Sequence, residues 1–288
     1  MEEFRQLAAP GYPVFLGSEF EHPAFDDALF HILPVPYEKS VSYGGGTRLG
    51  PASILEASWQ LEVWDGKSNP STLGIHTHPP VNCEVDTEQV IDNIAEVTQK
   101  IVAAGKIPIG LGGEHTVTYG IIKGLLASGV ENFGVVQIDA HAGNPYSHAS
   151  VMKRIVDEDI PLFQLGVRAY CEEEIHTRKV YDIRHLDADV LIPKNIQSFD
   201  LPDDFPDQVF FTLDIDGMDP SIFPSTGTPV PGGLGWYQTL SLFESVAKER
   251  KIIGFDIMEF APIDDFHAYQ FSASLLAYKM MGVVQRNS

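Results

Sequence analysis

The sequence predicts an α/β fold: a single domain with a mostly parallel, doubly wound sheet and helices on both faces, in three α/β/α layers. Short apolar runs typical of buried strands alternate along the chain with segments of helical periodicity. Parallel strands need long crossovers, and the intervening helices supply them. Neither a linker nor an internal repeat divides the chain, so we expect one domain over residues 28–288, preceded by an N-terminal arm over residues 1–27.

The expected strands are short apolar segments that end at proline, glycine or polar residues. They cover residues 28–33, 73–77, 106–111, 133–138, 162–167, 208–213 and 251–257. Pro34 and Pro36 are expected to end the first strand, because proline lacks the N–H that a sheet ladder uses. The arm before this strand is rich in aromatic residues, proline and glycine, and we expect it to pack on the body or on a neighbouring subunit.

The clearest helix opens at Asp86. Its apolar residues, from Val90 to Val102, recur at helical spacing, and Gly105 is placed to close it. Further helices are expected near residues 51–60, 117–127, 235–248 and 269–281. The glycine-rich stretch 42–48 has neither the glycine order nor the Gly-Lys-Ser/Thr ending of a phosphate-binding loop, so it is interpreted as a turn into the helix that follows.

The composition of the chain limits the classes of partner that we expect it to bind. The chain has 19 basic and 40 acidic residues and a net charge of −21, which argues against nucleic acid and anionic membranes and is compatible with a cationic ligand. The alternative is that the acidity only keeps the protein soluble. Two cysteines cannot build a disulfide framework, and the chain has no signal peptide and no 18-residue apolar run. We therefore expect a cytoplasmic protein.

Polar groups suited to a metal follow three of the expected strands. They are His115, the pair Asp139 and His141, and the pair Asp214 and Asp216. Because side chains alternate along a strand, the members of each pair should point the same way, at the carboxyl edge where α/β sheets place their sites. Carboxylates held this close resist burial unless a cation compensates them. Mixed imidazole and carboxylate ligands suit Mn²⁺, Fe²⁺ or Zn²⁺, and the excess of carboxylates suggests two ions bridged by shared acids.

Each of these signals has a plain alternative. A lone histidine beside two glycines is more often a loop residue, and an Asp-x-Asp sequence often caps a turn. Their joint recurrence at successive strand ends is what favours a metal site.

Residues 112–115 (Gly-Gly-Glu-His), 139–141 (Asp-Ala-His) and 212–216 (Thr-Leu-Asp-Ile-Asp) resemble the signature motifs of the ureohydrolases, the arginase and agmatinase family. The likeness extends over most of the chain and implies the arginase-like form of the α/β/α fold. It also implies that the five residues named above hold two Mn²⁺ ions per subunit, with Asp139 and Asp214 shared. Such a centre generates hydroxide from water near neutral pH, and this hydroxide attacks the guanidinium carbon.

The resemblance assigns three further residues. Glu259 matches the family's guanidinium-binding glutamate, which acts in both catalysis and substrate binding, and a planar guanidinium pairs well with a carboxylate. His148 matches the catalytic histidine that moves protons to the leaving amine, and Thr228 lies in the loop that shapes the pocket near the substrate. Without the resemblance, Glu259 reads as a surface acid after a strand and Thr228 as part of a proline- and glycine-rich loop.

The expected partner is a cationic guanidino compound of small size. Residues 146–149 and 36–38 look closer to agmatinase-type members, so agmatine, cleaved to putrescine and urea, is the first expectation. Arginase or guanidinobutyrase activity is the alternative. The family likeness also implies a homotrimer or homohexamer.

One position departs from the family pattern. The second motif of the family reads Asp-x-His-x-Asp, and its last aspartate is a metal ligand, but Gly143 stands there in this chain. His141 and His148 are also closer together than in the family. We expect that a loop carrying the missing aspartate belongs between Ala142 and Gly143. If the chain truly lacks it, a non-catalytic relative that binds a guanidino ligand or acts structurally becomes the competing hypothesis. A third hypothesis, a nucleotide-binding protein, is disfavoured because this chain has no phosphate-binding motif.

Overall fold

The computed structural model describes residues 11–17, 20, 22–41, 43–143 and 151–288. In this part of the chain eight strands form one sheet in the order β2-β1-β3-β8-β7-β4-β5-β6, and each neighbouring pair is parallel. The strands are β1 (Phe30–Val35), β2 (Ile75–Thr77), β3 (Ile107–Gly112), β4 (Phe133–Ile138), β5 (Leu162–Leu165), β6 (Arg184–Leu186), β7 (Gln208–Asp214) and β8 (Lys251–Met258). The predicted parallel sheet is confirmed.

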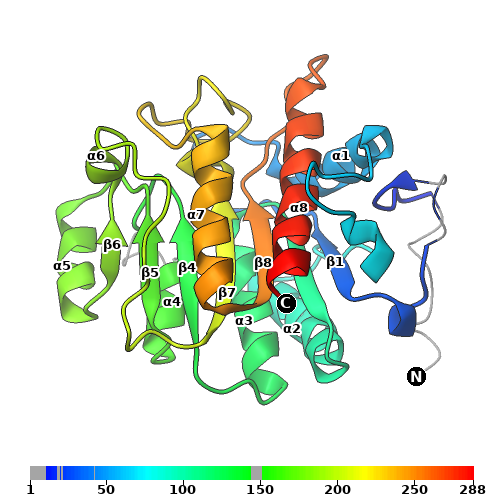
Figure 1. Cartoon of the computed structure of the whole chain (residues 1–288), viewed down its shortest axis with the longest axis horizontal. Coiled ribbons are helices and arrows are strands. Elements are labelled where there is room, and N and C mark those ends of the chain that lie inside the picture. The colour runs from blue at the N-terminus through cyan, green and yellow to red at the C-terminus, as the bar shows by residue number, and fades with distance from the viewer. Residues whose placement is uncertain (1–10, 18–19, 21, 42, 144–150) are drawn as a thin grey trace.

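Helices cover both faces of the sheet, as Figure 1 shows with α7 and α8 in front and α2, α3 and α4 behind. The helices are α1 (Gly50–Ala57), α2 (Thr87–Ala103), α3 (Thr118–Ala127), α4 (Val151–Asp157), α5 (Glu172–Val180), α6 (Ala188–Leu191), α7 (Trp236–Glu249) and α8 (Ala268–Asn287). Neighbouring residues of β7 face opposite layers. Phe211 packs in the core beneath α1, α7 and α8, and Phe210 packs in the core beneath α2, α3 and α4.

Local sequence explains why α2 begins and ends where it does. The side chain of Asp86 accepts a hydrogen bond from the backbone N–H of Gln89 at 3.0 Å, which satisfies a free donor of the first turn. Val90 and Ile94 are buried on one face, and Gly105 has a φ of +72° just after the last turn, a conformation that glycine adopts without strain.

The expectation that Pro34 ends the first strand is wrong. β1 continues to Val35, and Pro34 lies opposite Leu111 of β3. The carbonyl of Pro34 accepts from the N–H of Val81, on the side where β2 has already ended at Thr77. The missing N–H of Pro34 therefore faces the side where no strand partner remains, and its absence removes no hydrogen bond from the sheet.

Four elements went unpredicted: β6 and the helices α4, α5 and α6. They lie toward one edge of the sheet (Figure 1). In α5 the buried residues are the charged Glu174 and Arg178, so the helix carries no apolar stripe for periodicity to detect.

The N-terminal arm is described from Gly11 onward, apart from residues 18, 19 and 21. Phe15 and Leu16 are buried in the core beneath α1 and α8, which agrees with an arm packed on the body. Its expected contact with a neighbouring subunit stays a prediction. None of the described helices combines the length and the apolar character needed to cross a membrane.

Candidate metal centre and active site

Two groups of acidic and histidine side chains that could hold metal ions lie at the carboxyl edge of the sheet. One group is His115, Asp139 and Asp214, and the other is Asp139, His141 and Asp216; within each, one ligand atom per residue lies within 4.8 Å of the others. The residues follow β3, β4 and β7, so strands distant in sequence deliver them to one place. All five residues expected to be ligands are brought together.

Turns, and not alternation along a strand, place the second ligand of each pair, which corrects the reason given from the sequence. β7 ends at Asp214, and Asp216 lies in the following 3-10 turn Ile215–Gly217. Oδ1 of Asp214 accepts from the N–H of Asp216 at 2.8 Å, and Oδ1 of Asp139 accepts from the N–H of His141 at 2.6 Å. Each first aspartate thus fixes the turn that carries the next ligand, and Asp214 and Asp216 end in different groups.

The acids of the site are buried together and perturb one another. Burial, with the nearby charges of Asp216 and Asp139, raises the pKa of Asp214 well above its ordinary value. Burial opposes a charged His115, but its contacts with Asp139 and Asp214 outweigh this and raise its pKa well above the usual range. Hydrogen bonds with Asp139 and Asp216 raise the pKa of His141 to about 11.

These side chains fit a pair of divalent cations. The contacts with buried acids that raise the pKa of His115 and His141 show that positive charge is favoured at this place, and bound divalent cations would supply it. Asp139 belongs to both groups, as expected of a shared ligand. Asp214, also expected to be shared, belongs to one group; its Oδ1 accepts from the N–H of Asp216, and its Oδ2 lies 3.0 Å from Nδ1 of His115.

A buried polar chain that was not predicted from the sequence holds Asp139 in place. Nε2 of Gln137 donates to Oδ2 of Asp139 at 2.6 Å, and Nε2 of Gln164 donates to Oε1 of Gln137 at 2.7 Å. Nε of Arg178 donates to Oε1 of Gln164 at 2.8 Å. Nothing in the sequence points to these residues, because their contact depends on the register between β4 and β5 and on the polar helix α5.

Glu259 follows β8 and lies beside the first group. Its Oε1 accepts from the backbone N–H of His115 at 2.7 Å, and burial raises its pKa to about 7. The residue has a φ of +60°, a strained conformation for a side chain other than glycine. The strained backbone holds a half-buried carboxylate where the metal groups meet a cavity of about 480 Å³.

Glu259 and both metal groups line this cavity, together with Thr228, Glu114 and Glu174. Oγ1 of Thr228 donates to Oδ2 of Asp216 at 3.2 Å. Arg168 holds the loop that carries Thr228, because its guanidinium donates to the carbonyls of Asp216 and Val230, both at 2.6 Å. Thr228 therefore lies on the wall of the cavity, and its contact with a substrate stays a prediction.

Glu114 and Glu174 are acids of the cavity that the sequence did not single out. Glu114 lies inside the Gly-Gly-Glu-His motif and accepts from the backbone N–H and the hydroxyl of Ser40, each at 2.5 Å, so it holds the loop after β1 against the site. Glu174 accepts from the backbone N–H of Cys171 at 2.7 Å through one carboxylate oxygen. It is buried although it stands in the acidic first turn of α5, which reads as a solvated helix start.

His148 lies outside the described residues, so its role stays a prediction. Gly143 is described, with a φ of +89°, and it lines the cavity where the family has an aspartate. Ala142 is buried, and its carbonyl accepts from Nε2 of Gln164 at 3.0 Å. The full sequence runs directly from Ala142 to Gly143, so the prediction of a loop between them is wrong, and the last aspartate of the family's second motif is absent from this chain.

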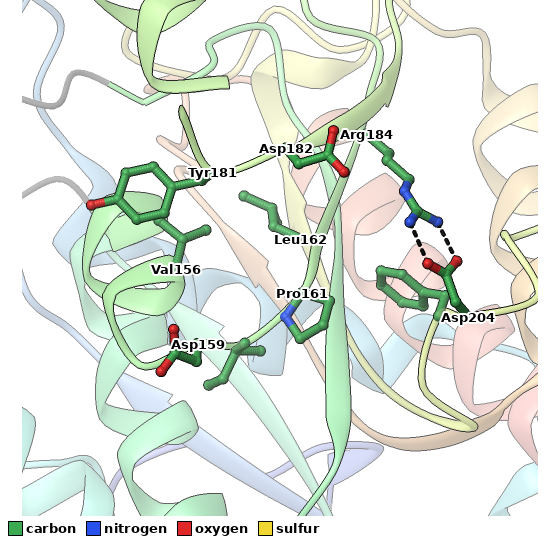
Figure 2. Close-up of a pocket in the computed structure, with 10 residues that line it drawn as sticks. Val156, Asp159, Pro161, Leu162, Tyr181, Asp182, Arg184 and Asp204 are labelled. Carbon is green, nitrogen blue, oxygen red and sulfur yellow. Dashed lines mark hydrogen bonds and ion pairs between the residues drawn. The ribbon is translucent and has the colours of Figure 1, made fainter. Parts of the chain in front are cut away.

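A second cavity, of about 270 Å³, lies at the opposite edge of the sheet, where β5 begins after Pro161 (Figure 2). Arg184 and Asp204 pair there through two hydrogen bonds, at 2.5 and 2.6 Å. Neither metal group of the described residues includes a residue of this cavity. The concentration of buried acids and histidines therefore marks the carboxyl edge as the functional one.

A search of protein-family models matches the arginase family over residues 28–282. The chain therefore belongs to the arginase family, the ureohydrolases, and the resemblance seen in its motifs is confirmed.

Several relatives of the chain within this family have a named activity. The chain is 36% identical over 292 residues to the N(1)-aminopropylagmatine ureohydrolase of Synechocystis sp., with 90% of each chain covered. It is 31% identical to the agmatinase of Pyrococcus horikoshii, with 93% of this chain and 97% of the relative covered. Among solved structures, the agmatine ureohydrolase of Thermoplasma volcanium matches with a TM-score of 0.79 and 28% identity, over 91% of this chain and 92% of that one.

Proposed function

We propose that the protein is a binuclear manganese enzyme that hydrolyses a linear guanidino amine to urea and an amine, with agmatine as the first candidate. The observation that carries this proposal is the placement of Glu259 beside two metal groups that share Asp139, in one cavity. Hydrolysis of a guanidinium needs an activated water and an anion that orients the planar cation, and this arrangement can provide both.

Each residue has a role in this scheme. The carboxylate of Glu259 pairs with the guanidinium and orients its carbon toward the metal groups. Bound Mn²⁺ would supply the Lewis acidity that makes a nucleophile from water at neutral pH. The water oxygen adds to the guanidinium carbon, one C–N bond breaks, and the leaving nitrogen takes up a proton and departs as the amine. His148 is proposed to deliver that proton, since imidazole titrates near neutrality.

Glu174 supports a substrate with a second positive charge. It is a buried acid of the same cavity and hydrogen-bonds the chain through Oε2. Agmatine carries a primary ammonium at the end opposite its guanidinium, and a carboxylate on the cavity wall suits it. N(1)-aminopropylagmatine, which carries a further amine, is the second candidate, because relatives at 33–36% identity bear that name.

The test is urea release from agmatine, N(1)-aminopropylagmatine, arginine and guanidinobutyrate by protein loaded with Mn²⁺. We expect turnover of one or both of the first two, and slower turnover of guanidinobutyrate, which has a carboxylate where agmatine has an ammonium. Glu174→Gln should raise the KM for agmatine and lower that for guanidinobutyrate, because it removes a charge that attracts an ammonium and repels a carboxylate. If no substrate yields urea although Mn²⁺ is bound, the enzyme assignment fails and the non-catalytic binding role takes its place.

A further inference from the structure

Both carboxylate oxygens of Asp139 accept a hydrogen bond from an uncharged donor. Oδ1 accepts from the backbone N–H of His141, and Oδ2 accepts from Nε2 of Gln137, both at 2.6 Å. Each oxygen of an ionised carboxylate has about two positions for a donor or a metal. A second position on each oxygen therefore remains for a metal, which suits an acid that belongs to both metal groups.

Gln137 is the first of three buried residues that lead away from Asp139. Nε2 of Gln164 donates to Oε1 of Gln137 at 2.7 Å, and Nε of Arg178 donates to Oε1 of Gln164 at 2.8 Å. Gln137 and Gln164 lie opposite each other in the register of β4 and β5, whereas Arg178 comes from α5. The chain of hydrogen bonds thus crosses two strands and ends on a helix.

The two ends of this chain decide how both amides are oriented. A glutamine amide can exchange the places of its oxygen and its nitrogen and still fill the same space. A guanidinium can only donate, so Oε1 of Gln164 must face Arg178. The carbonyl of Ala142 accepts from Nε2 of Gln164 at 3.0 Å and requires the same orientation. Gln137 must then accept from Gln164, which turns its own Nε2 toward Asp139.

We propose that Arg178 is a positioning residue of the metal centre. Acting through Gln164 and Gln137, its guanidinium fixes the orientation of the Asp139 carboxylate that both metal groups share. A reversed Gln137 would present Oε1 to Oδ2 of Asp139, and two acceptors cannot hydrogen-bond. Outer residues of this kind raise metal affinity by holding a ligand in its binding orientation. The proposal rests on the metal centre proposed above and is independent of its substrate.

The surroundings of Arg178 hold its guanidinium at the end of the chain. Nη1 donates to Oδ2 of Asp187 at 2.9 Å, in an ion pair that is largely buried. Glu174 stands one turn before Arg178, and these two are the buried residues of α5. Glu174 lines the cavity, whereas Gln164 and Arg178 are not among the described residues that line it. The inner face of α5 therefore presents one charged residue to the cavity and another to the chain.

The test is the affinity for Mn²⁺, measured without substrate from the electron paramagnetic resonance signal of free Mn²⁺ during titration. Gln164→Glu is the sharpest variant, because a carboxylate keeps the shape and forms an ion pair with Arg178 but cannot donate to Gln137. Gln137 would then reverse and lose its contact with Asp139. We expect both binding events to weaken roughly 10- to 100-fold, the range typical of lost outer partners. The added negative charge alone would strengthen cation binding, so this result separates orientation from charge.

Variants at the other end of the chain complete the test. Arg178→Met removes the donor and should weaken both events as Gln164→Glu does, whereas Arg178→Lys supplies a new donor and should recover part of the affinity. Lys179→Met, at the next and exposed residue of α5, is the matched control and should bind Mn²⁺ as the wild type does. Circular dichroism checks each fold first. If Arg178→Met does not fold, Gln164→Glu decides, because it leaves Arg178 paired.

Wild-type affinities in Gln164→Glu would overturn the proposal, and so would equal weakening in Lys179→Met and Arg178→Met. These outcomes are distinct from a failure of the proposed function. A wild-type protein that binds Mn²⁺ without releasing urea would not be the proposed enzyme, yet the affinities of its variants would still decide the role of Arg178.

Discussion

Glu259 combines a left-handed backbone, partial burial and a hydrogen bond to the backbone of His115. A conformation of this kind costs on the order of 1–3 kcal/mol and persists where the surrounding structure enforces it, which occurs most often at functional sites. The residue that sequence motifs assign to the guanidinium is thus also the one whose backbone geometry is most unusual near the cavity.

We predict that Glu259→Gln weakens substrate recognition and leaves the metals bound. The amide keeps the shape and the contact with His115 but loses the charge that pairs with the guanidinium, and such losses typically cost on the order of 2–5 kcal/mol. The measurements are kcat/KM for agmatine and metal content by elemental analysis. Glu131→Gln, on the exposed surface, is the matched control; an unaltered kcat/KM in Glu259→Gln would remove the residue from the site.

A second prediction follows from the membership of Asp139 in both metal groups. Asp139→Asn should weaken both Mn²⁺ binding events, whereas Asp216→Asn should weaken one and leave the other near its wild-type affinity. Calorimetric titration with Mn²⁺ distinguishes the two patterns. Loss of a single event in both variants would mean that Asp139 is not shared.

At the scale of elements, β1, β2 and the residue that follows β2 carry a buried histidine cluster that the active site does not use. It consists of His31, His76 and His78, and Nδ1 of His31 lies 3.0 Å from Nε2 of His78. Burial, and then the neighbouring histidines, lowers the pKa of His31 to about 3 and that of His78 to about 2; burial also lowers that of His76. Below a pH of about 6.5 the unfolded chain protonates these rings while the folded chain does not.

We therefore expect this cluster to destabilise the fold in mild acid. Where the unfolded state binds more protons, the free energy of unfolding falls as the pH falls, by about 1.4 kcal/mol per pH unit for each proton. His78→Gln removes one such proton, so its stability should decrease less steeply between pH 6.5 and 5 than that of the wild type. Urea unfolding of the Mn²⁺-loaded protein measures this, since bound metal keeps His115 and His141 from titrating. Exposed His176→Gln is the control, and parallel curves for His78→Gln and wild type would refute the expectation.

The sequence predicted elements well where burial dictates composition and poorly where it does not. β4 was predicted at its observed bounds because it is an apolar run buried throughout. β6 and α5 were not predicted because their residues are largely polar and lie at the sheet edge. The closeness of Asp214 and Asp216 was foreseen for the wrong reason, since a hydrogen-bonded turn and not strand alternation places them.

At the scale of the whole molecule, we propose that the chain assembles into a homotrimer or homohexamer. The family likeness motivates this, and large aromatic side chains on the surface support it, with Trp64 60% exposed and Tyr237 79% exposed. Analytical ultracentrifugation of the metal-loaded protein should give three or six times the chain mass of 31.8 kDa. A species of one chain mass at micromolar concentration would contradict this prediction.

What the sequence could not reveal at this scale is the set of contacts that depends on strand order. Gln164 supports Asp139 through Gln137, a neighbour that becomes adjacent only when β4 and β5 pair in the finished sheet. His115 and Asp139 could be identified from sequence motifs because ligand residues cluster in short segments. The residues that support the ligands are scattered one by one along the chain.

The position of β8 has a consequence for how the protein is made. The last strand in sequence lies between β3 and β7 in the middle of the sheet, so before it forms the sheet consists of two separate halves. Asp139, His141 and Asp216 all follow strands of one half, but His115 comes from the other. A nascent chain on the ribosome can thus assemble the second metal group once residue 216 has emerged, whereas the first must wait until β8 has joined the two halves. Metal loading during synthesis is therefore expected to be ordered, with the His115 position filled last.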